Sequence, residues 1–171
     1  MNTKYEFTGE TKIVYGRTLR RIKAIVAIGS TVDPGEIGGW IESENNLSVS
    51  GNAWVSGNAK VHGNAKVYGN ACVSGNAMVS GNARVSGNAD VYGNAKVYGN
   101  SGYMTFKNSW SSGRWFTYTA SNKKWKVGCF YGTGDELVRR AYSDSELSGK
   151  CYEAIVRAVE AIEAAKGSGV K

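Results

Sequence analysis

The sequence predicts a mainly β protein built around a parallel β-helix, with a β-hairpin cap before it and a small α+β module after it. Three observations lead to this prediction. The hexapeptide V-x-G-N-A-x repeats nine times without interruption from Val49 to Asn100, and a short fixed period of this kind is typical of a β-helix. The pattern of residues 1–46 is typical of paired strands followed by a glycine-rich loop. Residues 101–171 resemble an aromatic hairpin followed by two helices. We therefore divide the chain into residues 1–46, 47–100 and 101–171.

Residues 1–46 are expected to form a cap. Residues 5–28 alternate like the two strands of a hairpin. The passage after them contains the only proline, Pro34, among several glycines, which is typical of a tight loop. Trp40 and Ile41 at its end would then close the hydrophobic core. A cap is needed because the open end of a β-helix exposes unpaired backbone groups that invite uncontrolled association.

Each hexapeptide supplies one short strand and one tight corner. Side chains alternate between faces along a strand, so each alanine shares the interior with the valine two residues later. The Gly-Asn pair suits the corner, because glycine accepts a positive φ freely and asparagine tolerates it; the asparagines can also form a ladder. Ile37 lies in phase before Val49 and predicts an irregular first coil. The valines expected inside are those at positions 49, 55, 61, 67, 73, 79, 85, 91 and 97.

The V-x-G-N-A-x pattern resembles that of the left-handed parallel β-helix of hexapeptide-repeat proteins. In that family three hexapeptides make one triangular coil, which implies about three coils here, or roughly 14 Å of stacked strands. The variable positions then stack on three outward faces. The first face carries Ser50, Lys66, Tyr68, Arg84 and Ser86; the second Trp54, Ser56, Cys72, Ser74, Asp90 and Tyr92; the third Lys60, His62, Met78, Ser80, Lys96 and Tyr98.

A second resemblance covers residues 5–100. These residues contain, in order, a short hairpin, the motifs GGWIESE and LS, and the V-x-G-N-A repeats. This order is similar to that of a group of uncharacterised hexapeptide proteins encoded by bacteria and their phages. This resemblance implies the fold and a phage or prophage setting. It brings no activity with it.

The C-terminal part is basic and aromatic. Residues 101–132 contain five lysines and arginines, nine aromatic residues and no acid. Residues 114–119 and 124–130 are predicted to be two strands joined by a loop. Alternation would place Trp125 and Val127 on a mostly apolar face that helices cover. The other face would mix cations with aromatics, among them Phe116 and Tyr118. Thr133-Gly134-Asp135-Glu136 is a capping box that predicts the first of two helices.

A basic face with interleaved aromatic residues is typical of binding to a nucleotide or a single-stranded nucleic acid, because cations meet phosphates and rings stack on bases. The alternative is that the tryptophans form a core and the lysines are merely solvated. The candidate ligand-binding residues are Lys107, Arg114, Trp115, Tyr118, Lys123, Lys124, Trp125 and Lys126, and the secondary candidates on the third face are Lys60, His62, Lys96 and Tyr98.

Composition limits the setting. The formal charge is +7 over 171 residues, which favours an anionic partner. The three cysteines lack the spacing of a metal site and cannot all pair, and no signal peptide is apparent. We therefore expect a reducing cytoplasm, with no metal and no cofactor. The resemblance to phage-encoded proteins implies the cytoplasm of an infected or lysogenic bacterial host. No apolar run approaches the roughly 18 residues of a membrane span. Exposed Trp54, Cys72 and Met78 would be contacts of a homo-oligomer, such as a trimer.

We expect a non-catalytic binding protein. In the phage setting it would be an accessory, anti-defence protein that sequesters a nucleotide-type signal, or that blocks a host defence protein or a nucleic-acid-handling protein. One alternative is a structural, oligomeric scaffold. Another is a hexapeptide-repeat acyltransferase, but the only histidine, His62, sits at an ordinary repeat position, and Asp90 belongs to another face. A general base needs a positioned partner and a cleft, so no catalytic residue is assigned.

Overall fold

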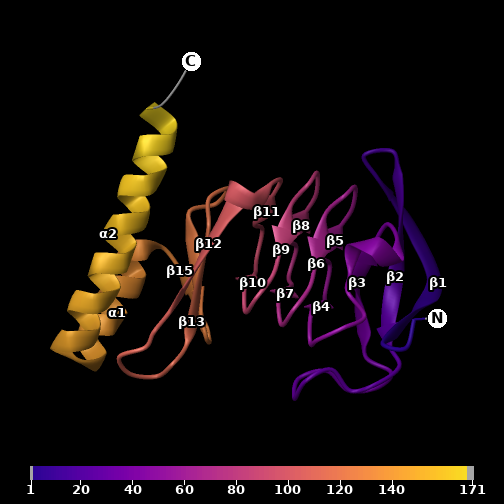
Figure 1. Ribbon diagram of the computed structural model, residues 1–171, viewed down its shortest axis with the longest axis horizontal. Helices are drawn as coiled ribbons and strands as arrows, with labels where there is room; N and C mark the ends of the chain where they lie inside the picture. The colour runs from indigo at the N-terminus through magenta and orange to yellow at the C-terminus, as the bar shows by residue number, and fades with distance from the viewer. Residues whose placement is uncertain (1, 169–171) are drawn as a thin grey trace.

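A computed structural model of the protein describes residues 2–168. The molecule is elongated, with a hairpin at one end, stacked coils in the middle, and a sheet with two helices at the other end (Figure 1). Its fold is mainly β, as predicted. Two hydrophobic cores hold it together: the hairpin shares one core with the coils, and the C-terminal module has its own.

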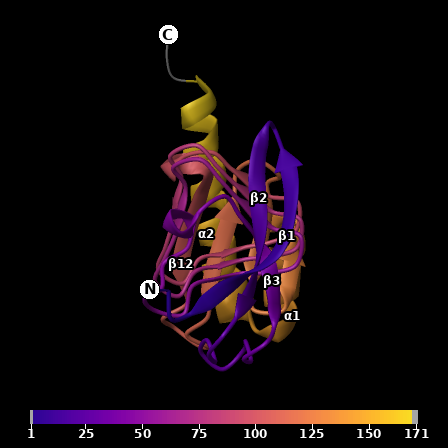
Figure 2. The same cartoon turned by 90° about the vertical axis from the view of Figure 1, so that its right-hand side faces the viewer.

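The N-terminal hairpin lies at one end of the stack of coils and extends one face of it (Figure 1). Strands β1 (Tyr5–Val14) and β2 (Arg17–Ala24) are antiparallel, and β3 (Ile37–Ile41) pairs with β2 on one side and with the first coil on the other. Figure 2, viewed from the N-terminal end of the stack, shows the three strands in front of the coils. The cap is thus the first part of a six-stranded sheet, in the order β1-β2-β3-β5-β8-β11.

Eight two-residue strands form the β-helix. They stack in three columns, β4–β7–β10, β5–β8–β11 and β6–β9, with parallel pairing. Trp54 pairs with Cys72, and Cys72 with Asp90, so one coil takes three hexapeptides and the chain makes about three coils. The strands are β4 (Trp54–Val55), β5 (Lys60–Val61), β6 (Lys66–Val67), β7 (Cys72–Val73), β8 (Met78–Val79), β9 (Arg84–Val85), β10 (Asp90–Val91) and β11 (Lys96–Val97).

The interior is filled as the repeat predicts, with an exception at its start. Every repeat valine from Val55 to Val97 is fully buried, and the alanines before them are at most 1 % exposed. Val49, however, is 47 % exposed, so the prediction was wrong for this valine. Ile37 is 43 % exposed, although the irregular first coil that it predicted is present. Leu47 and Ile41 take the interior places instead, pairing with Val67 and Val61.

This exception has a simple cause. Val61 follows Ile41, and Val67 follows Leu47, by 20 residues. The regular coils repeat every 18 residues. The irregular first coil is therefore two residues longer, and the short 3-10 helix η1 (Glu44–Asn46) lies within it. The hexapeptide phase consequently shifts by two residues before the regular coils begin.

The corners behave as predicted. The corner glycines from Gly51 to Gly93 have φ between 62° and 71°. The asparagines form a partial ladder, in which the Asn64 side-chain amide donates to Asn82 Oδ1 at 3.1 Å and that of Asn70 donates to Asn88 at 3.3 Å.

The β-helix has a direction, which sets the chemistry of both ends. Each coil donates its backbone N–H groups to carbonyls of the following coil, as from Trp54 N to Ala71 O at 3.0 Å. The first coil therefore has carbonyls without a donor. Trp40 N supplies one to Ala59 O at 2.9 Å. The Lys4 ammonium supplies another to Ala53 O at 2.6 Å.

The last coil has the opposite need, because its N–H groups lack acceptors. Side-chain oxygens from the C-terminal segment provide them. Thr117 Oγ1 accepts from Asp90 N at 2.9 Å, and Ser121 Oγ accepts from Lys96 N at 2.7 Å. The Tyr103 hydroxyl accepts from a third N–H group of this coil at 3.2 Å. Both ends of the β-helix are thus closed by groups of the required polarity.

The C-terminal module is larger than the predicted hairpin plus two helices. The hairpin of β13 (Trp115–Thr119) and β14 (Lys124–Val127) is confirmed, but β12 (Tyr103–Lys107) and β15 (Phe130–Gly132) flank it in a four-stranded antiparallel sheet. Helices α1 (Gly134–Asp144) and α2 (Glu146–Ser168) follow, and the predicted capping box of Thr133 and Glu136 begins α1. The 3-10 helix η2 (Asn100–Gly102) joins the module to the last coil.

The register of this sheet overturns the predicted faces. Phe116 pairs with Val127 and Tyr118 with Trp125, so these four side chains share one face and form the core beneath the helices. The prediction had placed Trp125 and Val127 on the face opposite Phe116 and Tyr118. Loop length sets the register of a hairpin, and a slip of one residue moves every side chain to the other face. The other face, with Thr117, lies against the last coil.

Candidate ligand-binding groove

Three of the predicted ligand-binding residues serve the structure of the C-terminal module. Tyr118 and Trp125 are 6 % and 2 % exposed, so neither ring is open to stacking on a base. The Lys126 ammonium lies 3.5 Å from the Asp90 carboxylate and 5.3 Å from the centroid of the Tyr92 ring. Lys126 thereby joins the sheet to the last coil.

The other C-terminal candidates are divided between the two faces of the sheet. The Lys107 ammonium lies 5.9 Å from the centroid of the Trp115 ring. Arg114 lines a small cavity of about 200 Å³ on the helix side of the sheet. Lys123 is exposed at the hairpin turn, with a left-handed φ of 53°, and Lys124 is half-buried. The register places Lys107, Trp115, Lys124 and Lys126 on the face of Thr117, which lies against the last coil, whereas the Phe116 and Tyr118 rings lie beneath the helices.

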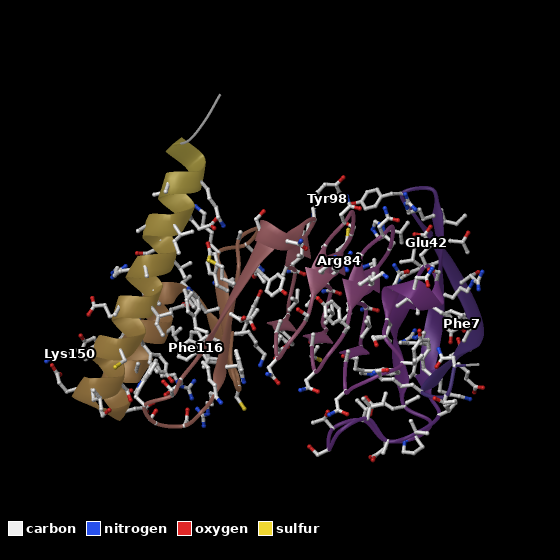
Figure 3. The ribbon with its side chains drawn as sticks, in the orientation of Figure 1. Phe7, Glu42, Arg84, Tyr98, Phe116 and Lys150 are labelled. Carbon is white, nitrogen blue, oxygen red and sulfur yellow. The ribbon has the colours of Figure 1, made fainter. Side chains whose placement is uncertain are left out.

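A larger groove lies beside the N-terminal hairpin. It has a volume of about 760 Å³ and is formed by three segments that are distant in sequence. The start of β2 contributes Arg17, the segment after β3 contributes Glu42, and successive coils contribute stacked corners. In Figure 3, Glu42 lies beside the hairpin and Tyr98 farther along the stack, both toward the same edge. The groove is lined by Arg17, Glu42, Ser43, Asn45, His62, Gly63, Asn64, Ala65, Lys66, Ser80, Gly81, Asn82 and Tyr98.

The repeat itself places two of the four secondary candidates, His62 and Tyr98, at this groove. Lys60 pairs with Met78, and Met78 with Lys96, as stacking on the third face predicts. His62 and Tyr98 occupy the next outward position on the same strands, because side chains alternate along a strand, and both line the groove.

Glu42 fastens the hairpin to the first regular coil. Its carboxylate accepts a hydrogen bond of 2.7 Å from Gly63 N and bonds of 2.9 and 3.1 Å from the Arg17 guanidinium. The bond from Gly63 N, followed by Arg17, lowers the pKa of Glu42. The carboxylate therefore stays charged at neutral pH and neutralises part of the Arg17 charge.

His62 forms part of the groove wall. The side chain is only 7 % exposed, and its Nε2 is buried without a hydrogen-bond partner. The Tyr15 ring from the hairpin tip lies 6.3 Å away, measured between ring centroids. Burial, helped by Arg17 and opposed by Glu42, lowers the pKa of His62. The imidazole is therefore neutral at neutral pH and shielded from solvent.

Tyr98 forms an open aromatic rim. It is 77 % exposed, whereas Tyr68 and Tyr92, at the equivalent repeat position, are each 39 % exposed. Gly81 permits its position, because a Cβ there would stand 2.8 Å from the Tyr98 ring. Such a ring offers a flat face to a planar ligand.

The predicted oligomer contacts differ in their exposure. Trp54 is only 3 % exposed, and Tyr5 and the loop of Ile28 and Val32 lie against it. It is therefore covered by its own chain and is not available to a partner. Cys72 and Met78 are half-buried, and burial raises the pKa of the Cys72 thiol to about 11.

Residues 2–168 contain no group of three or more histidine, cysteine or acidic side chains placed to hold a metal ion. The three cysteines are free. Within the same residues, neither helix is long and apolar enough to cross a membrane.

Sequence reasoning missed Arg17, Glu42 and Asn82 as groove residues. Glu42 lies within the GGWIESE motif, which was the one available signal. The proximity of Arg17 to the coils depends on how the hairpin folds back, and no local pattern encodes that.

Comparison with known proteins supports the architecture. A family model described as YdcK beta solenoid repeat matches residues 73–87, in the middle of the β-helix. No curated protein matches the chain. The stacked coils and this match together identify a β-solenoid.

Proposed function

We propose that the protein is a non-catalytic binding protein for a nucleotide-type anion, which it holds in the groove beside the hairpin. The carrying observation is that this groove combines an exposed aromatic ring, Tyr98, with the cations Arg17 and Lys66. A nucleotide carries the complementary groups, a planar base and a phosphate. The volume of about 760 Å³ falls within the roughly 300–1,000 Å³ of ligand sites.

The groove replaces the C-terminal sheet as the preferred site. Of the three C-terminal candidate rings, those of Tyr118 and Trp125 are buried and only that of Trp115 is exposed, at 37 %. Arg114 faces the helices, whereas Lys126 faces the last coil. A ligand that contacts Arg114 would therefore lie on the opposite side of the sheet from Lys126.

The geometry of the groove fits a binding site better than the active site of an acyltransferase. A general base must reach the proton that it abstracts, but the Nε2 of His62 is buried. The nearest carboxylate, that of Glu42, already accepts from Gly63 and Arg17. Asp90 belongs to a different sheet.

The closed ends argue against a scaffold that grows by stacking of coils. Lys4 occupies the carbonyls at one end, and Thr117 and Ser121 occupy the N–H groups at the other. A second molecule would have to displace these bonds in order to continue the coil.

The biological part of the proposal comes from the resemblance to hexapeptide proteins of phages. A phage-encoded accessory protein could act against a host defence by sequestering a nucleotide signal. Sequestration requires no reacting residue, only affinity and abundance. Occupation of a host defence protein is the competing route to the same end.

Calorimetric titration with linear and cyclic nucleotides tests the proposal. At least one nucleotide should bind and should be recovered chemically unchanged. Tyr98→Leu should weaken binding at least about tenfold, since aromatic stacking contributes roughly 1–3 kcal/mol per base. Tyr68→Leu is the matched control, because it alters the same repeat position on another face. If no nucleotide binds, or if the two variants behave alike, the proposed site is wrong.

A further inference from the structure

A row of side chains crosses the outer face of the six-stranded sheet. Backbone register places Arg21 beside Trp40, Trp40 beside Lys60, Lys60 beside Met78, and Met78 beside Lys96. Within the coils these residues point outward, because the residue that follows each of them is buried inside. Adjacent strands are about 4.8 Å apart, so the row extends for roughly 19 Å.

Cations crowd the hairpin end of this row. The Lys12 ammonium lies 3.9 Å from the centroid of the Trp40 ring, and the Arg21 guanidinium carbon lies 5.1 Å from it. Lys60 is the next residue in register. Burial, followed by repulsion from Lys60 and Arg21, lowers the pKa of Lys12 to about 8.

Little negative charge balances these cations. Arg21 lies 3.6 Å from the Glu10 carboxylate. Among the ion pairs of residues 2–168, none involves Lys12, Lys60 or Lys96. The row therefore repels itself, and a bound polyanion would relieve that repulsion.

We propose that this cationic row, formed by Lys12, Arg21, Lys60 and Lys96, binds the phosphate backbone of a single-stranded nucleic acid that crosses the strands. A single phosphate cannot meet charges spread over roughly 19 Å, whereas a phosphodiester chain presents a charge at every nucleotide. Proteins that bind single strands combine a basic track with aromatic rings that stack on bases.

The exposed ring of Tyr98 beside the row favours a nucleic acid over an acidic protein segment as the ligand. Tyr98 stands two residues beyond Lys96 and is 77 % exposed. A base attached to the backbone on the row would reach this ring. The proposal concerns the row, and it stands even if the groove binds no free nucleotide.

The repeat provides a matched control. Lys60, Lys96 and Arg84 occupy the same position of the hexapeptide, but Arg84 stacks on Lys66 in a different sheet. Arg84 is exposed and, within residues 2–168, forms no ion pair. Its replacement removes one charge from the β-helix without touching the row.

Fluorescence anisotropy with a labelled oligothymidylate of about 20 nucleotides, a length above the roughly 4–16 nucleotides of typical single-strand sites, tests the proposal. For single strands, log K falls with log salt concentration with a slope of about −0.7 per phosphate neutralised. Lys60→Gln and Lys96→Gln should each make the slope shallower by about 0.7, and the double variant by about 1.4. Arg84→Gln should leave the slope unchanged. Tyr98→Leu should weaken binding and should also leave the slope unchanged.

Three outcomes would overturn the proposal. The wild-type protein could fail to bind the oligonucleotide at low salt. Arg84→Gln could reduce the slope as much as Lys60→Gln does, which would indicate diffuse attraction by net charge. Polyglutamate could displace the oligonucleotide at equal charge concentration, which would indicate an acidic protein as partner. Circular dichroism of each variant shows that the fold is kept, and failure of the separate mononucleotide titration would not affect these readings.

Discussion

At the scale of the residue, single side chains take the place of missing backbone partners. The Lys4 ammonium donates to Ala53 O and Ser48 O, where the regular coils would use a backbone N–H group. Lys4 is only 3 % exposed, and burial lowers its pKa to about 8. The protein tolerates a buried cation here because it satisfies carbonyls that would otherwise lack a donor.

Lys4→Met should therefore lower the free energy of unfolding by about 1–3 kcal/mol, the cost of leaving buried polar groups unsatisfied. Urea denaturation measures this change. Lys23→Met is the control, because the Lys23–Glu6 ion pair lies on the surface, and such pairs contribute about 0–1 kcal/mol. Equal losses in the two variants would mean that Lys4 is not a cap.

Lys12 gives the cationic row a pH dependence. It faces Arg21 from β2 and Lys60 from β5 across the Trp40 ring, with Glu10 on its own strand. As the pH rises through about 8, Lys12 loses its proton, so oligonucleotide affinity should fall. Lys12→Arg should abolish that fall, because a guanidinium stays charged. Anisotropy at constant salt measures both proteins.

Stability should change in the opposite direction. The folded-state pKa values of Lys4 and Lys12, both about 8, lie below the ordinary value of 10.5. The native state therefore binds fewer protons than the unfolded chain just above pH 8, and stability rises with pH. Above pH 9 the raised pKa of Cys72 opposes this trend. Affinity that falls between pH 8 and 9 while stability rises cannot result from unfolding.

At the scale of the element, the corners depend on their stacking. Gly75 and Gly87 have similar φ angles, 70° and 66°. A Cβ added at Gly75 would stand 3.0 Å from Gly93 N, whereas a Cβ added at Gly87 would have no neighbouring atom within 4 Å among the described residues. Gly87→Ala should cost only the backbone strain, about 1–2 kcal/mol. Gly75→Ala should cost more, because its neighbours are backbone atoms. Thermal unfolding of both variants measures the difference, and equal losses would contradict the stacking.

Thr117 provides one of the hydrogen bonds between the C-terminal sheet and the last coil. Its Oγ1 accepts from Asp90 N, whereas Thr105, its cross-strand neighbour, makes no such bond within the described residues. Thr117→Val should cost about 1–3 kcal/mol, since it leaves a buried donor unpaired, and Thr105→Val should cost less. Denaturant titration compares the two, and a reversed order would mean that the bond is unimportant.

The sequence predicted the elements better than their phase. Nine in-phase valines indicated the coils, because one inward residue per hexapeptide leaves few alternative folds. The repeat also predicted that Val49 is buried. Because the first coil is longer, Leu47 occupies that interior position and Val49 is exposed. In the C-terminal sheet, Trp125 lies beneath the helices as predicted, but Phe116 and Tyr118 were assigned to the wrong face because hairpin register depends on loop geometry.

At the scale of the whole molecule, the groove arises from assembly. Arg17 and Glu42 come from the cap, whereas His62 and Tyr98 come from two different coils. Stacking predicted that His62 and Tyr98 share a face, since they are in phase. It could not predict the return of the hairpin onto that face, because that contact depends on long-range packing.

The central claim is that this molecule binds a nucleotide-type ligand and does not react with it. Native mass spectrometry of protein purified gently from cells, with and without added nucleotides, tests it most directly. The account predicts a discrete species that carries nucleotide mass, retained in Tyr68→Leu and lost in Tyr98→Leu. A clean species with no adduct under any of these conditions would contradict the claim and would favour a protein target.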